Sequence, residues 1–294
     1  VNPDPDSIGS ALALSNLFHE NKIKHKVFNI SSDLPQNLDF IPRFDKITDQ
    51  LPAFFDLAIS VDCGTYKRLG FELDPSIPLI NFDHHKSNNS FGAVNIVDPQ
   101  KSSTAELVFE FFKHNGLYIT KDSATALYVG IYDDTLAFSL GRCDEKTFEK
   151  INFLVECGAS PSEIANKLLR RDSLAKYRII PKVLDSLELF KEGEVASIVA
   201  YEEWFKQTGA HNRDCEDALD MIMSIAIVRI AIFVRVVNGV SRVSLRSKGQ
   251  IDVSKIAGEF GGGGHFNASG CTIETLDVEK AKEIVLKEIF EIYK

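Results

Sequence analysis

Ile77-Pro78-Leu79-Ile80-Asn81-Phe82-Asp83-His84-His85 is the stretch around which the chain is organised. Its apolar run with β-branched residues predicts a buried strand, and the strand ends in one carboxylate and two imidazoles. In an α/β protein, polar side chains at the carboxyl end of a central strand face the ligand crevice. Two adjacent imidazoles there can divide the work, because one can bind a metal while the other meets the substrate. A chance Asp-His-His in a surface loop is the alternative, and the neighbouring motifs argue against it.

The composition is that of a globular protein with one large or two medium domains: 294 residues, 44% of them hydrophobic and 26% charged. The most apolar window, residues 221–237, is interrupted by Arg229 and Arg235, so we expect no membrane span. The five cysteines are odd in number and have no short metal-type spacing. They therefore fit reduced thiols and a cytoplasmic protein better than a disulfide framework.

The net charge of −9 narrows the range of partners. Proteins that coat long nucleic acids bind mainly by neutralising phosphates, so an acidic chain argues against long duplex nucleic acid as a partner. The charge leaves open a small anionic ligand that is held by bound cations and a few local Arg and Lys side chains.

The chain begins with an acidic motif, Asn2-Pro3-Asp4-Pro5-Asp6-Ser7-Ile8-Gly9-Ser10. Two carboxylates, at Asp4 and Asp6, flank a proline of fixed φ and so form a stiff acidic turn. We expect Ser7 or Asp6 to cap the helix that follows, and Gly9 in its first turn indicates a close contact with another element. Helix capping is the alternative explanation for both acids, but a cap needs only one.

Three further motifs place polar residues at the ends of predicted strands or helices. Residues 56–62 form a second apolar run, and it too ends in a carboxylate, Asp62. A predicted helix at 124–131 runs into an acidic turn, Tyr132-Asp133-Asp134-Thr135. The motif Ser103-Thr104-Ala105-Glu106 predicts a capping box that opens another helix. Capping explains this motif sufficiently, and a substrate contact by its hydroxyls is the less favoured alternative.

Four carboxylates and one imidazole thus stand at element ends of the first domain, where an α/β sheet places its site: Asp4, Asp6, Asp62, His84 and Asp134. Such an oxygen-rich set with few imidazoles suits Mn²⁺ or Mg²⁺ better than thiolate-seeking metals. Two such ions about 3.5–4 Å apart stabilise the attacking and leaving oxygens of an in-line displacement at phosphorus. The carboxylates would repel one another without cations, so bound metals also account for the collected charge.

The remainder of the chain contains one basic region in an otherwise acidic protein. A β-hairpin is predicted about Asn238-Gly239, which is a strong turn signal. Between residues 229 and 255, six basic residues stand against one acid, and period two puts Arg242 and Arg246 on one strand face. A solvated outer face is the alternative to a ligand-binding one.

A glycine run follows this region, Gly261-Gly262-Gly263-Gly264-His265. Four consecutive glycines cost backbone entropy and are unexpected in a plain connector of a compact domain. They let main-chain N–H groups approach a phosphate closely, and His265 can donate to the same group. A flexible linker is the alternative, although a predicted strand at 271–274 and an amphipathic terminal helix follow at once.

In their order along the chain, these motifs resemble those of the DHH phosphoesterase family: residues 2–10, 61–62, 83–85, 133–135 and 261–265. The C-terminal part resembles the DHH-associated substrate domain, and the likeness covers nearly the whole chain. It implies an α/β fold with a mainly parallel N-terminal sheet flanked by helices, and a smaller C-terminal α/β domain. The implied boundaries are 1–175 for the catalytic domain, 176–193 for a helical connector and 194–294 for the substrate domain.

The resemblance also implies the metal ligands. Asp62 would bridge two Mn²⁺ ions, for which Mg²⁺ or Co²⁺ could substitute. Asp6, His84 and Asp134 would complete one metal site, and Asp4 would serve the other.

Catalytic and substrate-binding residues follow from the same resemblance. His85 would face the scissile phosphate. Asp83 would orient a histidine as a hydrogen-bond partner that does not itself touch metal or substrate. The second domain would hold the far end of the substrate, through Arg246, Ser247, Gly262, Gly263, Gly264 and His265.

Two departures from the family pattern stand out. The first motif usually opens with a histidine just before the position of Val1, so we expect an upstream strand and a histidine in the native protein. The fourth motif usually has Thr or Ser where Asp133 stands, which leaves the role of Asp133 open.

Within the family, the expected substrates are short oligonucleotides or pAp-like nucleotides. Family exonucleases for long single strands are larger, and family pyrophosphatases have a different C-terminal domain. A compact two-domain chain resembles the nano-RNases that also dephosphorylate pAp. The alternatives are a phosphodiesterase of cyclic or linear dinucleotides and a catalytically silent nucleotide-binding regulator. We expect no membrane partner, and a homodimer is compatible with the sequence.

Overall fold

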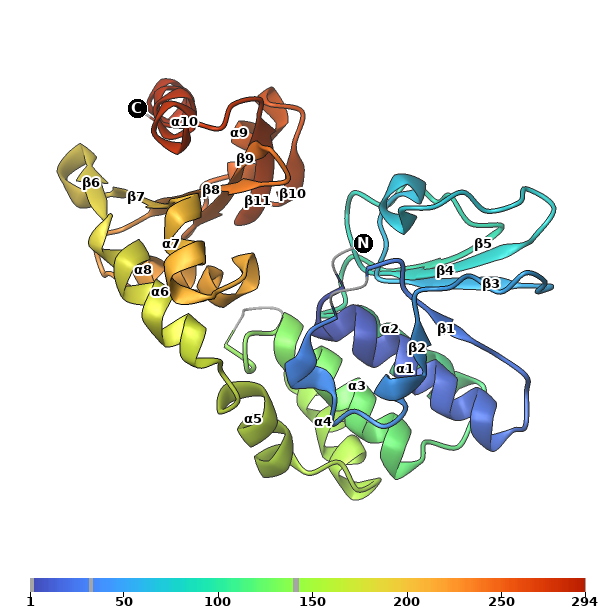
Figure 1. The fold of residues 1–294 in the computed structure, drawn as a ribbon. Coiled ribbons are helices and arrows are strands. Elements are labelled where there is room, and N and C mark those ends of the chain that lie inside the picture. The colour runs from blue at the N-terminus through green and yellow to red at the C-terminus, as the bar shows by residue number, and fades with distance from the viewer. Residues whose placement is uncertain (1–2, 32–33, 140–142, 294) are drawn as a thin grey trace. The chain divides into compact units, whose positions relative to one another are not determined.

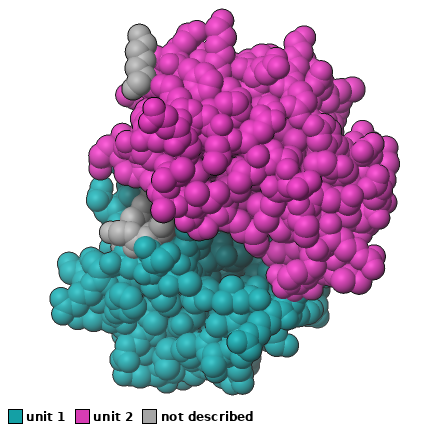
Figure 2. Space-filling model, turned by 90° about the vertical axis from the view of Figure 1, so that its left-hand side faces the viewer, with its two compact units in different colours: residues 1–171 teal, residues 172–294 magenta. Residues whose placement is uncertain are grey.

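The structure is a computed structural model that describes residues 3–31, 34–139 and 143–293 (Figure 1). Val1 and Asn2, the residues beside the expected upstream histidine, lie outside the described part. The chain divides into two compact units, residues 1–171 and 172–294, which Figure 2 colours separately. Each unit has its own hydrophobic core and is described by itself.

The first unit contains a three-stranded parallel sheet in the order β3-β4-β5 (Figure 1). The strands are β3 (Ala58–Val61), β4 (Leu79–Asp83) and β5 (Val94–Val97). The central strand, β4, is formed by the stretch that the sequence analysis predicted to be a buried strand. Two shorter parallel strands form a separate pair, β1 (Val27–Phe28) and β2 (Ile47–Thr48). The prediction of a parallel N-terminal sheet in an α/β fold is therefore confirmed.

Helices supply most of the core of this unit, in which Leu12, Val108 and Leu127 are fully buried. Helices α1 and α2 contact the sheet at β3 and β4, respectively. The α-helices are α1 (Pro5–Glu20), α2 (Thr104–His114), α3 (Lys121–Asp134), α4 (Glu145–Glu156) and α5 (Pro161–Leu169). Short 3₁₀ helices are formed by Gln36–Leu38, Phe44–Lys46 and Tyr66–Leu69.

Helices α1 and α3 approach each other to backbone contact. A Cβ atom on Gly9 of α1 would collide with the carbonyl oxygen of Ala126 in α3. A Cβ atom on Gly130 of α3 would lie 2.6 Å from Ala105 Cβ and 2.7 Å from Asp6 Oδ1. The prediction of a close contact at Gly9 is therefore confirmed, and the glycine pair sets where Asp6 lies.

The start of α1 corrects one local prediction. Asp4, rather than Ser7 or Asp6, caps the helix, because Asp4 Oδ1 accepts a hydrogen bond from Ser7 N at 2.8 Å. Asp6 lies buried in the first turn. The reason is Pro5, whose fixed φ and missing N–H suit the first helical position and so make the preceding residue the cap.

Two further local predictions differ from the structure. The expected acidic turn at Asp133 and Asp134 is instead the end of α3, since both residues are still helical. The predicted capping box is half formed: Ser103 caps α2, but Glu106 accepts hydrogen bonds from Ser102 N and Oγ instead of reaching back to the cap. Ser102 offers two donors, and this makes it the better partner for the carboxylate.

The second unit is built on a six-stranded sheet in the order β10-β11-β9-β8-β7-β6 (Figure 1). Only β7 and β8 pair in parallel; the other pairs are antiparallel. The predicted turn joins β8 and β9, and Asn238 and Gly239 have the positive φ values, 52° and 83°, that a type I′ turn requires. The strands are β6 (Glu188–Phe190), β7 (Val195–Ala200), β8 (Ile230–Val237), β9 (Val240–Ser247), β10 (Gly263–His265) and β11 (Ala268–Ile273).

Helices cover both faces of this sheet. The α9 and α10 side chains share one core with one face, while α6 and α8 share another core with the opposite face. The helices are α6 (Leu174–Asp185), α7 (Glu202–Thr208), α8 (Asp217–Met223), α9 (Val253–Glu259) and α10 (Val278–Ile292). Short 3₁₀ helices are formed by Lys191–Gly193 and Asn212–Cys215.

The segment 176–193, which we expected to connect the domains, packs as part of the second unit. Helix α6 buries Ile179, Ile180 and Val183 in the same core as β7. The division between the units falls after Arg171 instead. The charged residues of α6 obscured its apolar stripe, and that stripe is what anchors the helix to the sheet.

Two expectations from composition can be compared with the structure. All five cysteines lie within the described residues, and each is a free thiol. No helix in the described ranges is both long and apolar enough to cross a membrane.

We predict opposite effects for alanine at two helical glycines. Gly9→Ala should destabilise the first unit by about 1–3 kcal/mol, because its methyl group would press into the α3 backbone. Gly258→Ala in α9 should be neutral or stabilising by up to about 1 kcal/mol, because nothing lies within 4 Å of the added atom. Calorimetric unfolding of both variants measures the difference, and a Gly9→Ala midpoint equal to that of the wild type would refute the close contact.

Candidate metal centre

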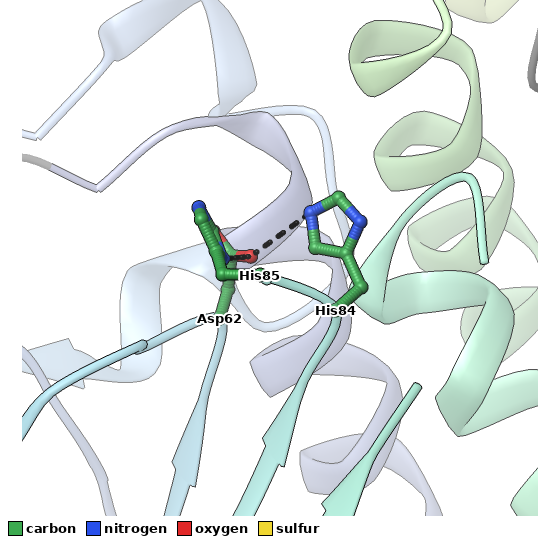
Figure 3. A group of neighbouring side chains, drawn as sticks. All are labelled: Asp62, His84 and His85. Atoms are coloured by element: carbon green, nitrogen blue, oxygen red, sulfur yellow. Dashed lines mark ion pairs between the residues drawn. The ribbon is translucent and has the colours of Figure 1, made fainter. Parts of the chain in front are cut away.

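The carboxyl ends of two neighbouring strands bring Asp62 together with the Asp-His-His motif. Strands β3 and β4 are parallel, with Val61 opposite Phe82, so their ends lie at the same edge of the sheet. Figure 3 shows the convergence: His84 Nε2 lies 3.7 Å and His85 Nδ1 3.6 Å from Asp62 Oδ1. Asp62 has a φ of 56°, in the left-handed region, and so turns the chain sharply after β3.

Two helix ends add a second set of ligand atoms around the same imidazole. Asp6 comes from the first turn of α1, and Asp134 from the last position of α3. His84 Nε2 lies 3.2 Å from Asp134 Oδ2. Ligand atoms of Asp6, His84 and Asp134 lie within 4.8 Å of one another, and the same is true of Asp62, His84 and His85. His84 belongs to both groups.

Asp4 is placed differently from the other predicted ligands. It is exposed, caps α1 and belongs to neither group. Its charge is nevertheless close enough to contribute to the raised pKa of both Asp6 and Asp62. A carboxylate that caps a helix through one oxygen can still offer the other to a cation.

Hydrogen bonds orient both imidazoles. His84 Nδ1 lies 3.3 Å from the carbonyl oxygen of Lys101, so we assign the proton to Nδ1 and the lone pair to Nε2, which faces the aspartates. His85 Nδ1 lies 2.7 Å from Asp83 Oδ1, and Asp83 is fully buried. This contact has the geometry that the expected orienting role of Asp83 requires.

The first turn of α2 supports the aspartates, a contribution that the sequence analysis missed. Backbone N–H groups of Thr104 and Ala105 donate to the Asp6 carboxylate at 2.7 and 2.9 Å. The Thr104 hydroxyl donates to Asp62 Oδ1 at 2.9 Å. Ser103 caps the helix by itself, so the second hydroxyl of the Ser103-Thr104 pair was the available signal of a further role.

Burial dominates the ionisation of the two buried aspartates. It raises the pKa of Asp6 well above its ordinary value, and the charges of Asp134 and Asp4 raise it further. Burial also raises the pKa of Asp62, together with the charges of Asp4 and Asp6. Such carboxylates ionise readily only when positive charge compensates them.

Polar contacts together outweigh burial in setting the pKa values of Asp83 and His85. Burial works to raise the pKa of Asp83, but the hydrogen bonds from His85 and Asn88 outweigh it and lower the pKa. Burial works to lower the pKa of His85, but the hydrogen bond to Asp83 and the charge of Asp62 outweigh it and raise the pKa. The pair is therefore an ionised carboxylate beside a firmly held imidazole.

The donor set fits hard divalent cations. Two groups of oxygen and imidazole donors share one histidine, and no thiol belongs to either group. This chemistry suits Mg²⁺ or Mn²⁺ better than thiolate-seeking metals. Bound cations would also stabilise the ionised form of Asp6 and Asp62, whose pKa values burial raises.

In the second unit, strand register puts two predicted substrate-binding residues in one row. Arg246 of β9 pairs with Ala268 of β11, which pairs with His265 of β10. Cross-strand partners share a face, so Arg246 and His265 lie on the same side with a small residue between them. Arg246 also has Asp220 Oδ1 3.7 Å from its Nε.

The fold requires glycine at two of the three predicted substrate-binding glycine positions, 262 and 264, and for a different reason at each. A Cβ on Gly262 would collide with the carbonyl oxygen of Gly270, and Gly264 has a φ of 145°. Nothing lies within 4 Å of a Cβ on Gly263, and its φ is not positive, so the fold itself does not require a glycine there. Ser247 is buried, donating to Ile251 O at 2.6 Å and accepting from Asn267 at 2.9 Å.

Two domain families match the chain in the order of its units. The DHH family, N-terminal domain, matches residues 1–131, and the DHHA1 domain matches residues 195–293. The bifunctional oligoribonuclease and PAP phosphatase NrnA of Thermus thermophilus is 29% identical over 294 residues, covering 99% of this chain and 87% of that protein.

Two further proteins resemble nearly the whole chain. The cyclic-di-AMP phosphodiesterase PdeA of Listeria monocytogenes is 26% identical over 313 residues, covering 99% of this chain and 46% of that protein. The crystal structure of an exopolyphosphatase-related protein from Bacteroides fragilis has a TM-score of 0.89 and 27% identity, covering 99% of this chain and 91% of that one. Together with the two domain matches and the convergent aspartates and histidines, these likenesses lead to one conclusion: the chain contains a DHH family domain, matched over residues 1–131, followed by a DHHA1 domain, matched over residues 195–293.

Proposed function

We propose that the chain is a Mn²⁺-dependent phosphoesterase that hydrolyses short oligonucleotides and pAp-like nucleotides. The observation that carries the proposal is the sharing of His84 between two groups of ligand atoms, each within 4.8 Å. The relative named as an oligoribonuclease and PAP phosphatase supports this substrate class. Relatives of that name align with nearly the whole chain.

In this proposal, Asp62 would bind both of two cations. Asp6, His84 and Asp134 would complete the site of one cation, and Asp4 would serve the other. When bound, such cations lower the pKa of coordinated water and offset charge that develops on the phosphoryl oxygens. His85 would face the scissile phosphate through Nε2, because Asp83 engages its Nδ1 at 2.7 Å. Thr104 and the α2 backbone hold the carboxylates in place without being ligands.

The DHHA1 domain contributes substrate binding. Arg246 and His265 lie in one row of the sheet and can donate to phosphate or base oxygens. Gly263, on the same strand face as His265 by period two, leaves open space in which a flat group of the substrate can lie. Ser247, Gly262 and Gly264 support this face, Ser247 through its bonds to the following loop and the glycines by keeping β10 close to β11.

A cyclic-dinucleotide phosphodiesterase is the second candidate, favoured by the likeness to PdeA. Both candidates need the same metals, so the products distinguish them. Purified protein with Mn²⁺ should release mononucleotides from short RNA and AMP from pAp, as measured by chromatography. Turnover of cyclic dinucleotides alone would favour the second candidate, and no turnover of any substrate would favour a silent regulator.

We predict a graded loss of metal from two substitutions. Asp62→Ala should abolish binding of both ions, whereas Asp134→Ala should mainly remove one, because only Asp62 is proposed to bridge. Titration calorimetry with Mn²⁺ gives the stoichiometry of each variant, and Asp122→Ala, at the exposed opposite end of α3, is the control. Two ions retained in Asp62→Ala, or full activity in excess chelator, would refute the two-metal proposal.

The metal-free protein should lose stability as the pH rises. Asp6 and Asp62 have raised pKa values in the folded state, so the folded chain binds more protons than the unfolded chain does. Their contribution is complete below the unfolded pKa of about 3.9 and is lost as the pH rises through the raised folded pKa. Because cations replace these protons, Mn²⁺ should raise the melting temperature more at about pH 8 than at about pH 5. Equal shifts at the two pH values would contradict this linkage.

We predict that the row on the DHHA1 sheet binds substrate without touching the metals. Arg246→Ala and His265→Ala should each lower kcat/KM on substrates of two to five nucleotides about ten- to hundredfold, as expected for charge-assisted contacts of about 1.5–3 kcal/mol. Mn²⁺ affinity should not change. Arg242→Ala removes the same charge from the same strand and serves as control. Equal losses in all three variants would indicate diffuse charge instead of specific contacts.

A further inference from the structure

The loop that follows the Asp-His-His motif is exposed except at one side chain. Lys86, Ser87, Asn89 and Ser90 are exposed, whereas Asn88 is half-buried and turned toward the motif. None of the roles assigned above uses Asn88. Its placement therefore needs an explanation of its own.

The polar atoms of Asn88 are all engaged. Its Nδ2 donates to Asp83 Oδ2 at 2.6 Å and to the carbonyl oxygen of Cys63 at 3.4 Å. Its Oδ1 accepts from Ser90 N at 2.7 Å. This pattern assigns the amide orientation, with both donors toward the site and the acceptor toward the loop.

One of these hydrogen bonds gives the second carboxylate oxygen of Asp83 a partner. The carboxylate is fully buried, with Oδ1 bound to His85 Nδ1 and Oδ2 bound to Asn88. With a donor on each oxygen, the carboxylate cannot rotate without breaking a short buried hydrogen bond. Asn88 thereby holds the acceptor that fixes the tautomer and ring orientation of His85.

The other bond acts on the turn after β3. Cys63 follows Asp62, whose left-handed backbone is unfavourable for a residue other than glycine and persists only under external restraint. A second amide, from the buried Asn81, donates to the same Cys63 carbonyl at 3.3 Å. Asn81 is itself held by Ser60 Oγ at 2.8 Å. Two amides thus restrain the turn that aims Asp62.

We propose that Asn88 is a positioning residue that sets the place of His85 relative to Asp62, by holding Asp83 and the Cys63 carbonyl with one side-chain amide. The role rests on the proposed function, in which His85 faces the scissile phosphate and Asp62 binds the cations. Asn88 itself touches neither substrate nor metal in this role.

Kinetics and metal binding test the proposal with matched variants. Asn88→Ala should lower kcat on pAp and a dinucleotide about ten- to hundredfold, the range typical of lost outer hydrogen-bond partners, with little change in KM or Mn²⁺ stoichiometry. Asn88→Asp, which replaces the donor by an acceptor facing Asp83, should lose at least as much. Asn89→Ala is the control, because Asn89 is exposed and the hydrogen bond to Gly64 O uses its backbone N–H.

A double-mutant cycle separates positioning from general stability. In a His85→Ala background, Asn88→Ala should cause a smaller fold-loss of kcat than in the wild type, because the imidazole that it positions through Asp83 is gone and only its bond to the Cys63 carbonyl remains to be lost. A merely structural role would produce the same fold-loss in both backgrounds. That result, or wild-type kinetics in Asn88→Ala, would overturn the proposal.

A measurement without turnover distinguishes this inference from the proposed function. Nitrogen NMR of histidine-labelled, metal-free protein should show His85 as the Nδ1–H tautomer in the wild type and as a mixture in Asn88→Ala, with His85→Ala identifying the signal. If the wild type turns over no phosphoester, the proposed function fails while the tautomer shift still supports the positioning role. An unchanged tautomer in Asn88→Ala refutes the positioning role whatever the activity.

Discussion

Burial of like charges is the constraint on which the first unit depends. Asp6 is 1% exposed, the Asp62 side chain 6%, and Asp134 adds a third carboxylate beside the imidazole of His84. The protein partly compensates these charges with N–H groups of α2 and the hydroxyl of Thr104. These dipoles compensate the buried charge only in part, which raises the pKa of Asp6 and Asp62 and favours the binding of divalent cations.

Close backbone packing makes this concentration of charge possible. Gly9 and Gly130 allow α1 and α3 to touch, and a methyl group at Gly130 would press directly on Asp6. The parallel pairing of β3 with β4 brings Asp62 to the same edge as His84. A ring of hydrogen bonds then orients the polar groups. The rigid elements thus set the distances, and the short polar contacts set the directions of the ligand atoms.

In the DHHA1 domain, some residues are needed to shape the sheet, and others are available on its surface. Gly262 and Gly264 are needed by the backbone, whereas Gly263 leaves space that the fold does not use. Register places Arg246 and His265 in one row, although 18 intervening positions separate them in the sequence. Gly263 and Gly264 therefore belong to the edge strand β10, and Gly261 and Gly262 lead into it.

By itself, the sequence determined the α/β class, the parallel sheet around the 77–85 stretch, the hairpin at Asn238-Gly239 and the set of acidic and imidazole side chains. The buried strand, the hairpin and the candidate side chains follow from local patterns: apolar runs, turn residues and polar groups at strand ends. The α/β class and the parallel pairing were implied by the resemblance to the DHH family. Tertiary structure alone decided that Asp4 caps α1, that α6 joins the second core, and that Thr104 and Asn88 donate hydrogen bonds to Asp62 and Asp83. Those outcomes depend on contacts between segments far apart in the chain. A side-chain hydrogen bond across such a distance leaves no periodic trace in the sequence.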